Sequence, residues 1–302
     1  MNRTKHYLSQ ALIHLTLVGA FGAPAGVLAG TSAARADATA SSHAHHAQEG
    51  TALYRTHSQM HPAPAQAGQP VTLTLTVRDG EGRAVSRLTP SHEKPMHLFV
   101  VSRDLRHFAH VHPSPAGDSF RVQHTFATAG EYTLFVDYQQ PGRGQVLDRH
   151  NVHVEGAAPP AAAALTESPR KQRADGLEVT LHSDAELRAG EAAMLHFDIT
   201  DAATGKPVAD LEPYLGAMAH FMVLSGDGQD FVHVHALDAR GSASRVSAHA
   251  VFPRSGLYKL WAQVQRHGEV ATVPFVVRVD GAEARPKAGP ASGPGGHAQH
   301  QH

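Results

Sequence analysis

Two groups of three histidines recur in this chain at identical spacing. Each group has one histidine followed thirteen residues later by a His-x-His pair: His97, His110 and His112 in the first, and His220, His233 and His235 in the second. Neutral imidazole is a ligand for copper, zinc and nickel, and three converging rings can hold one ion with nitrogen–metal distances of about 2.0–2.1 Å. The spacing therefore predicts a transition-metal site in each half. The alternative is a structural trio that hydrogen-bonds neighbouring loops, because duplication would copy either kind of site.

A tight turn in the second half indicates how these histidines could meet. The pair Asp227-Gly228 is typical of a hairpin turn. Counting outward from it, Met222 faces His233 and His220 faces His235. Side chains two residues apart on a strand share a face. The predicted metal ligands of the second half are therefore these three histidines and the sulfur of Met222.

The first half follows the same pattern around Asp104-Leu105, where Phe99 takes the place of the methionine and faces His110, while His97 faces His112. Four further histidines lie near this group in the chain and could assist: His57, His61, His92 and His107. The residues that alternate with the ligands should point to the opposite face and form core: Leu98, Val100, Ala109, Val111, Phe221, Val223, Val232 and Val234.

The composition restricts the type of metal site. The chain has 25 histidines and no cysteine, which excludes disulfides, iron–sulfur clusters, thiolate zinc sites and blue-copper centres. Calcium and magnesium need oxygen ligands. We therefore expect copper as the bound ion, with zinc and nickel as alternatives. Ligands must be unprotonated, so binding should weaken as the pH falls through the ordinary imidazole range near 6.5.

The rest of the chain is an internal repeat. Phe108-Ala-His-Val-His112 matches Phe231-Val-His-Val-His235, and Phe126–Phe135 matches Phe252–Trp261, among other blocks. The two copies span residues 52–155 and 177–281. Each has about seven short alternating strands separated by turn residues, which predicts two tandem immunoglobulin-like β-sandwich domains and an all-β fold. Tyr132 and Tyr258 occupy the place of a structural corner tyrosine.

The remaining segments differ in composition. Residues 1–38 combine a basic start, an apolar run broken by Gly22 and Pro24, and small-x-small sites at 34–36 or 36–38, which predicts a cleaved signal peptide rather than a membrane anchor. We expect a disordered histidine-containing segment at 39–51, a linker at 156–176 and a disordered histidine-containing tail at 282–302. The mature chain should then be periplasmic or secreted, with no membrane span.

The histidine blocks also resemble a known family. Pro95-Met-His97, with His110-Val-His112-Pro113 downstream, and Leu211-Glu-Pro-Tyr-Leu-Gly-Ala217, with its own histidines downstream, are similar to the YtkA-like group of exported bacterial sandwich domains. The resemblance covers both repeats. It implies an extracytoplasmic β-sandwich from a group suspected of metal handling, and it supplies no catalytic residues. Ala236 stands where the proline follows His112 in the first copy.

The sequence carries no recognisable enzyme motif, and a net charge of −1 gives no reason to expect nucleic-acid binding. We therefore expect a non-enzymatic, exported copper-binding protein for metal buffering, delivery or tolerance. Its partners would be the metal ion and another extracytoplasmic metal-handling protein. The alternative function is a non-catalytic interaction module that binds a partner protein or the cell envelope. A three-histidine zinc hydrolase is a third possibility.

Overall fold

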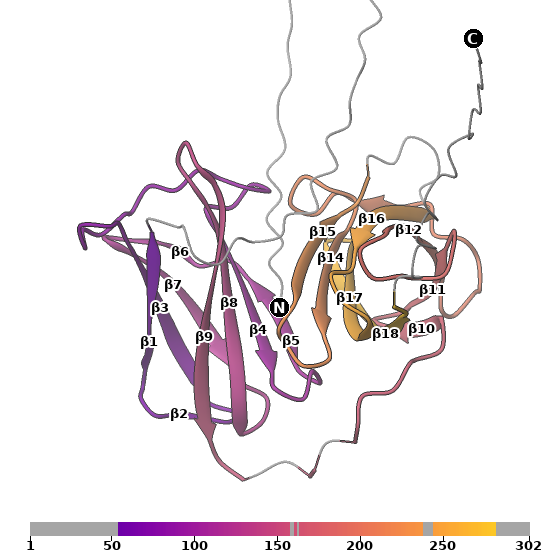
Figure 1. The fold of residues 1–302 in the computed structure, drawn as a ribbon. Helices are drawn as coiled ribbons and strands as arrows, with labels where there is room; N and C mark the ends of the chain where they lie inside the picture. The colour runs from indigo at the N-terminus through magenta and orange to yellow at the C-terminus, as the bar shows by residue number, and fades with distance from the viewer. Residues whose placement is uncertain (1–53, 158–159, 162, 238–243, 282–302) are drawn as a thin grey trace, which may run out of the picture. The chain divides into compact units, whose positions relative to one another are not determined.

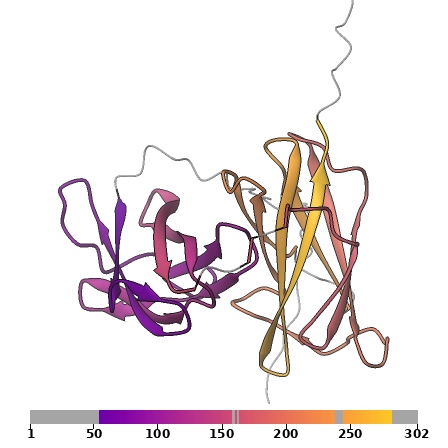
Figure 2. The same cartoon turned by 90° about the horizontal axis from the view of Figure 1, so that it is seen from below.

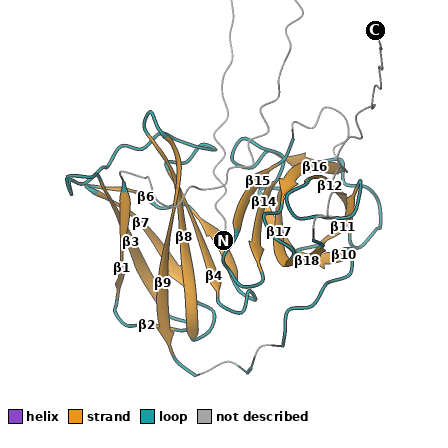
Figure 3. Cartoon of the chain, in the orientation of Figure 1, coloured by secondary structure: helices purple, strands orange, loops and turns teal. Residues whose placement is uncertain are grey.

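The computed structural model describes residues 54–157, 160–161, 163–237 and 244–281. Within these ranges every regular element is a β-strand, and no helix in them is long and apolar enough to cross a membrane (Figure 3). The strands form four sheets, paired into two β-sandwiches that correspond to the two repeats (Figure 1, Figure 2). The predicted all-β, two-sandwich fold is therefore confirmed. Both sandwiches belong to one compact unit of the chain.

The first sandwich has a four-stranded and a five-stranded sheet. The four-stranded sheet runs in the order β1 (Arg55–His61), β3 (Pro70–Arg78), β7 (Ser119–Thr125), β6 (Ser114–Ala116). The five-stranded sheet runs in the order β2 (Ala65–Gln66), β9 (Gly144–Glu155), β8 (Gly130–Gln140), β4 (Met96–Ser102), β5 (Phe108–Val111). All pairings are antiparallel except β2 with β9.

The second sandwich repeats this arrangement. One sheet runs in the order β10 (Lys171–Ala174), β11 (Leu177–Ser183), β12 (Ala192–Asp201), β16 (Arg245–Val251). The other runs in the order β13 (Leu211–Glu212), β17 (Gly256–Arg266), β14 (His220–Ser225), β15 (Phe231–His235), with β18 (Glu269–Val279) also paired to β17. Strand β10 lies inside the range 156–176 that composition predicts as a linker. There Lys171 and Arg173 form ion pairs with Glu178 of β11.

Sequence alternation explains both cores. Along β3 the buried positions are every second residue, Val71, Leu73, Leu75 and Val77, and the threonines between them point away from the core. The core clusters of the two sandwiches contain all the residues predicted for the core faces of the histidine hairpins, with Ala109 and Val111 packed at the edge of the first. The predicted facing of these hairpins is therefore confirmed.

The corner tyrosines lie where the repeat alignment predicts. The Tyr132 hydroxyl donates to the Thr128 carbonyl at 3.1 Å, and the Tyr258 hydroxyl donates to the Arg254 carbonyl at 2.9 Å. Each ring is about 2% exposed or less. Each tyrosine therefore closes the turn before a long central strand, β8 or β17, which is the structural role expected from the sequence.

A third apolar cluster contains side chains of both repeats. Its members are Phe99, Val101, Leu105, Phe135, Leu147, Met222, Leu224, Phe231 and Trp261. They come from the faces of the five-stranded sheets that carry the histidines. Those faces are therefore buried against apolar side chains, and they are not open to solvent as an isolated domain would leave them.

Candidate metal centre

The β4–β5 hairpin positions the first histidine group. Leu105 closes the turn with a backbone N–H bond to the Ser102 carbonyl at 2.9 Å, and its φ of 58° is left-handed. The resulting register pairs Phe99 with His110, as counting from the turn predicts. His97 on β4 and His110 on β5 therefore share one face of the sheet, and His112 follows directly after β5.

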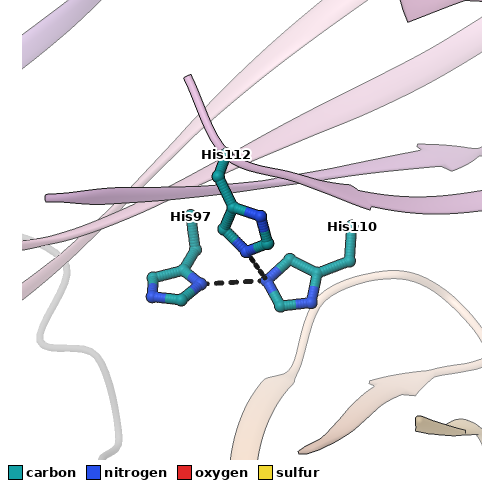
Figure 4. A group of neighbouring side chains, drawn as sticks. All are labelled: His97, His110 and His112. Carbon is teal, nitrogen blue, oxygen red and sulfur yellow. Dashed lines mark hydrogen bonds between the residues drawn. The ribbon is translucent and has the colours of Figure 1, made fainter. Parts of the chain in front are cut away.

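The three side chains of the first group converge (Figure 4). His97 Nδ1 lies 2.9 Å from His110 Nε2, and His112 Nε2 lies 3.2 Å from the same atom. One nitrogen from each ring falls within 4.8 Å of the other two. Among the described residues, this is the one group of three or more histidine, cysteine or acidic side chains close enough to hold a metal ion. The predicted first group thus forms a three-nitrogen cluster.

The hydrogen bonds at the outer edges of two rings assign their tautomers. His97 Nε2 lies 2.9 Å from the Ser91 carbonyl, which can only accept, so this nitrogen carries a hydrogen. His110 Nδ1 lies 2.8 Å from Gln263 Oε1, and it donates for the same reason. Gln263 Nε2 in turn donates to Thr272 Oγ1 at 3.1 Å. In a neutral ring whose outer nitrogen carries the hydrogen, the inner nitrogen can offer its lone pair to a cation.

His97 Nδ1 and His110 Nε2 lie 2.9 Å apart, at hydrogen-bond distance, and which of them donates depends on the tautomers of the two rings. A metal ion bound here would replace the shared hydrogen, because each inner nitrogen would then offer its lone pair as a ligand. Tetrahedral binding at about 2.0–2.1 Å needs nitrogens roughly 3.3 Å apart. The inner nitrogens must therefore separate by only a few tenths of an ångström.

Burial disfavours the charged forms of His97 and His112. His97 is 1% exposed, and burial lowers its pKa below the usual range, with the Ser91 carbonyl and Asp137 acting in the opposite direction. Burial also lowers the pKa of His112 to about 3, assisted by repulsion from His97. Neutral imidazole is the ligating form. Burial thus favours the ligating form of His97 and His112, and the pH at which metal binding weakens stays a prediction.

The second histidine group is only partly described. The register of β14 and β15 pairs Met222 with His233 and His220 with His235, as predicted from Asp227-Gly228. The side chains of His233 and His235 lie outside the described part of the structure. Whether this group binds metal therefore stays a prediction.

The structure describes the two other predicted ligands of this group. His220 is 2% exposed, its Nε2 donates to the Tyr214 carbonyl at 2.8 Å, and burial lowers its pKa to about 4. Met222 is packed in the apolar cluster shared by the repeats.

Several residues around the first group come from outside its hairpin. The ring of His220 lies 6.3 Å from that of His110 and 5.3 Å from that of His92, measured between centroids. The ring of Tyr214 lies 6.3 Å from that of His112. Gln263 and Tyr214 are not predicted from the sequence as parts of this site. Both residues lie next to His220 in the folded protein. Gln263 pairs with His220 across β14 and β17, and the Tyr214 carbonyl accepts a hydrogen bond from His220. Their closeness to a predicted ligand is the one signal that could have identified them.

Several solved structures of bacterial proteins are similar to this chain. They include FdeC, an Escherichia coli adhesin, with 17% identity over 77% of this chain and 65% of that one and a TM-score of 0.25. Invasin, a bacterial integrin-binding protein, has 15% identity over 73% of this chain and 39% of that one, with a TM-score of 0.23. The fibronectin(III)-like modules of Clostridium thermocellum CbhA have 12% identity over 82% and 100%, with a TM-score of 0.21. This chain spans less than two thirds of the first two.

No curated protein matches the chain. A family model does match it, over residues 52–156 and 172–281, which cover both repeats and well over half of the sequence. The chain therefore belongs to the family described as a domain of unknown function, DUF8832.

Proposed function

We propose that this protein binds a transition-metal ion, copper, at His97, His110 and His112. The observation that carries the proposal is the convergence of three rings, since one nitrogen each of His97, His110 and His112 lies within 4.8 Å of the other two. The outer nitrogens of two of these rings are bonded to the Ser91 carbonyl and to the Gln263 amide oxygen. Such outer hydrogen bonds fix the ring orientation and raise ligand basicity in known metal sites.

The donor set supports copper over the other candidates. All three ligand atoms are imidazole nitrogens. Divalent copper binds nitrogen sites more tightly than nickel or zinc does, and imidazole suits all three ions. Zinc and nickel remain the alternatives, and the second histidine group with Met222 would add a softer donor for monovalent copper.

We propose a role in extracytoplasmic metal buffering, delivery or tolerance. The basic and apolar start of the chain with its small-x-small sites supports export, and the histidine blocks support the likeness to the YtkA-like group. The burial of His97 supports storage or transfer of an ion over turnover of a substrate, because a substrate needs access to the metal. A delivery role would require another extracytoplasmic metal-handling protein as partner.

The test is copper binding by the full chain and two variants. We compare the parent with His112→Ala, which removes one ligand, and with His267→Ala, which removes a histidine whose side chain is 69% exposed. Copper equivalents are counted after desalting, and nitrogen hyperfine splitting in the electron paramagnetic resonance (EPR) spectrum reports the imidazoles bound. Circular dichroism confirms folding.

We expect His112→Ala to lose one tightly held equivalent and His267→Ala to lose none. Histidines elsewhere in the chain contribute equally to the parent and His112→Ala, so their difference measures the His97 group. If the two bind equally, the metal proposal fails, and the non-catalytic interaction module becomes the better reading of the sandwich.

A further inference from the structure

The histidine faces of the two repeats meet through matched aromatic pairs. Phe108 of the first repeat stacks on Trp261 of the second, with ring centroids 4.7 Å apart and planes 13° apart. Phe135 of the first repeat stacks on Phe231 of the second, with centroids 5.2 Å apart and planes 28° apart. The repeat alignment makes Phe108 equivalent to Phe231 and Phe135 equivalent to Trp261. The same contact is thus made twice, as in a two-fold dimer interface.

Polar contacts continue this interface to the metal centre. The Nδ1–H of His110 in the first repeat donates to Gln263 Oε1 in the second. The ring of His220 packs edge-on against that of His92, and the Leu215 backbone is hydrogen-bonded to His92. Gln263 is 6% exposed, so its amide sits inside the contact.

We infer that Gln263 is a positioning residue for the metal ligands of the first repeat, so that metal binding and docking of the two repeats are coupled. The inference rests on the proposed function, since it concerns the same centre. Gln263 holds the hydrogen of His110 on Nδ1 and thereby keeps the lone pair of Nε2 directed at the ion. When the repeats separate, the bond between His110 and Gln263 is broken. His110 can then carry its hydrogen on Nε2, and that nitrogen no longer offers a lone pair to the ion.

The coupling works in both directions. If docking raises metal affinity by a given factor, metal binding must favour docking by the same factor. Outer hydrogen bonds to ligating histidines typically change metal affinity about 10–100-fold. The bound ion would therefore stabilise the docked arrangement of the two repeats, although all three of its ligands come from the first.

The first experiment tests the positioning role of Gln263 with copper(II) in chelator competition. The affinity of the His97 group is the component that His112→Ala removes. Gln263→Leu removes the acceptor and should weaken this component about 10-fold or more. Gln263→Glu keeps an acceptor and should restore it. Gln265→Leu is the matched control on the same strand, since Gln265 donates to Glu212 within the second repeat. It should leave the affinity unchanged.

The second experiment tests the coupling to docking. Leu224→Asp places a charge in the shared apolar cluster, on a residue that is not among the metal ligands. It should weaken copper binding as Gln263→Leu does, and the double variant should be no weaker than either single one. Fluorescence of Trp261, the one tryptophan of the chain, reports whether the contact has opened.

The outcomes separate the two proposals. If the parent lacks a component that His112→Ala removes, the metal site itself is wrong, and this inference falls with it. If the site exists but Gln263→Leu binds copper as tightly as the parent, or Gln263→Glu fails to rescue, the positioning role is wrong. If Leu224→Asp opens the contact without changing the affinity, the coupling is wrong.

Discussion

His110 and Gln263 are separated by 153 residues in the chain, yet the imidazole Nδ1 of one donates to the amide oxygen of the other at 2.8 Å. This single bond joins the metal-ligand cluster of the first repeat to the central strand of the second. It also determines which nitrogen of His110 faces His97. The chemistry of the cluster therefore depends on a residue of the other repeat.

Acidity should distinguish the buried cluster from ordinary histidines. Because burial lowers the pKa of His112 to about 3, copper held by this group should remain bound at pH 5.5. Exposed histidines, with a pKa near 6.5, become protonated there and release metal. Copper equivalents retained at pH 7.5 and pH 5.5 measure this. If His112→Ala and the parent retain the same amount at pH 5.5, the buried group does not hold the ion.

The free energy of unfolding of the metal-free protein should fall as the pH is lowered. Burial lowers the pKa of His220 to about 4 in the folded state, while the unfolded value is about 6.5. The unfolded chain therefore binds more protons between these values. The free energy of unfolding is highest above pH 6.5 and falls by about 1.4 kcal/mol per pH unit for such a group as the pH drops toward 4.

Urea unfolding at pH 7.5 and pH 5 checks this expectation. His220→Gln should show a smaller difference between the two pH values than the parent. An unchanged pH dependence in His220→Gln would show that His220 is not the group responsible.

The second histidine pair offers a separate test. Val232 and Val234 lie in the core of the second sandwich, and alternation along a strand predicts that the histidines between and after them avoid that core. His233→Ala combined with His235→Ala should therefore leave the domain folded and remove one further copper equivalent. Native mass spectrometry counts the ions, and circular dichroism monitors the fold. Unfolding of the double variant would favour the structural role of this group.

The corner tyrosines should contribute equally to the two sandwiches. Tyr132→Phe and Tyr258→Phe each remove a hydroxyl bonded to a backbone carbonyl four residues earlier. Each should lower the free energy of unfolding by about 1 kcal/mol without affecting copper binding. Denaturant unfolding measures the loss, and Tyr54→Phe, directly before β1, is the control. If the free energy of unfolding falls no more than in the control, these hydrogen bonds do not stabilise the sandwiches.

Much of the fold follows from local patterns. Alternation along segments such as Val71 to Val77 determines which face is core, because successive side chains of a strand point to opposite sides. The turns at Asp104-Leu105 and Asp227-Gly228 determine the register of both histidine hairpins, since pairing is counted outward from the turn. These patterns place His97 and His110 on one face before any tertiary contact is known.

What the sequence leaves undecided is what covers that face. Tertiary contact places Met222 among apolar side chains, brings His220 beside His92, and sets Gln263 against His110. No local pattern encodes these contacts, because each joins residues of different repeats that are distant in the chain. Burial lowers the pKa values of His97 and His112, and the amide oxygen of Gln263 bonds the outer nitrogen of His110. The sequence by itself determined the ligand types and their common face, because both follow from residue identity and strand alternation. The tertiary structure decided how deeply the rings are buried and which groups of the other repeat contact them, because those contacts join residues distant in the chain.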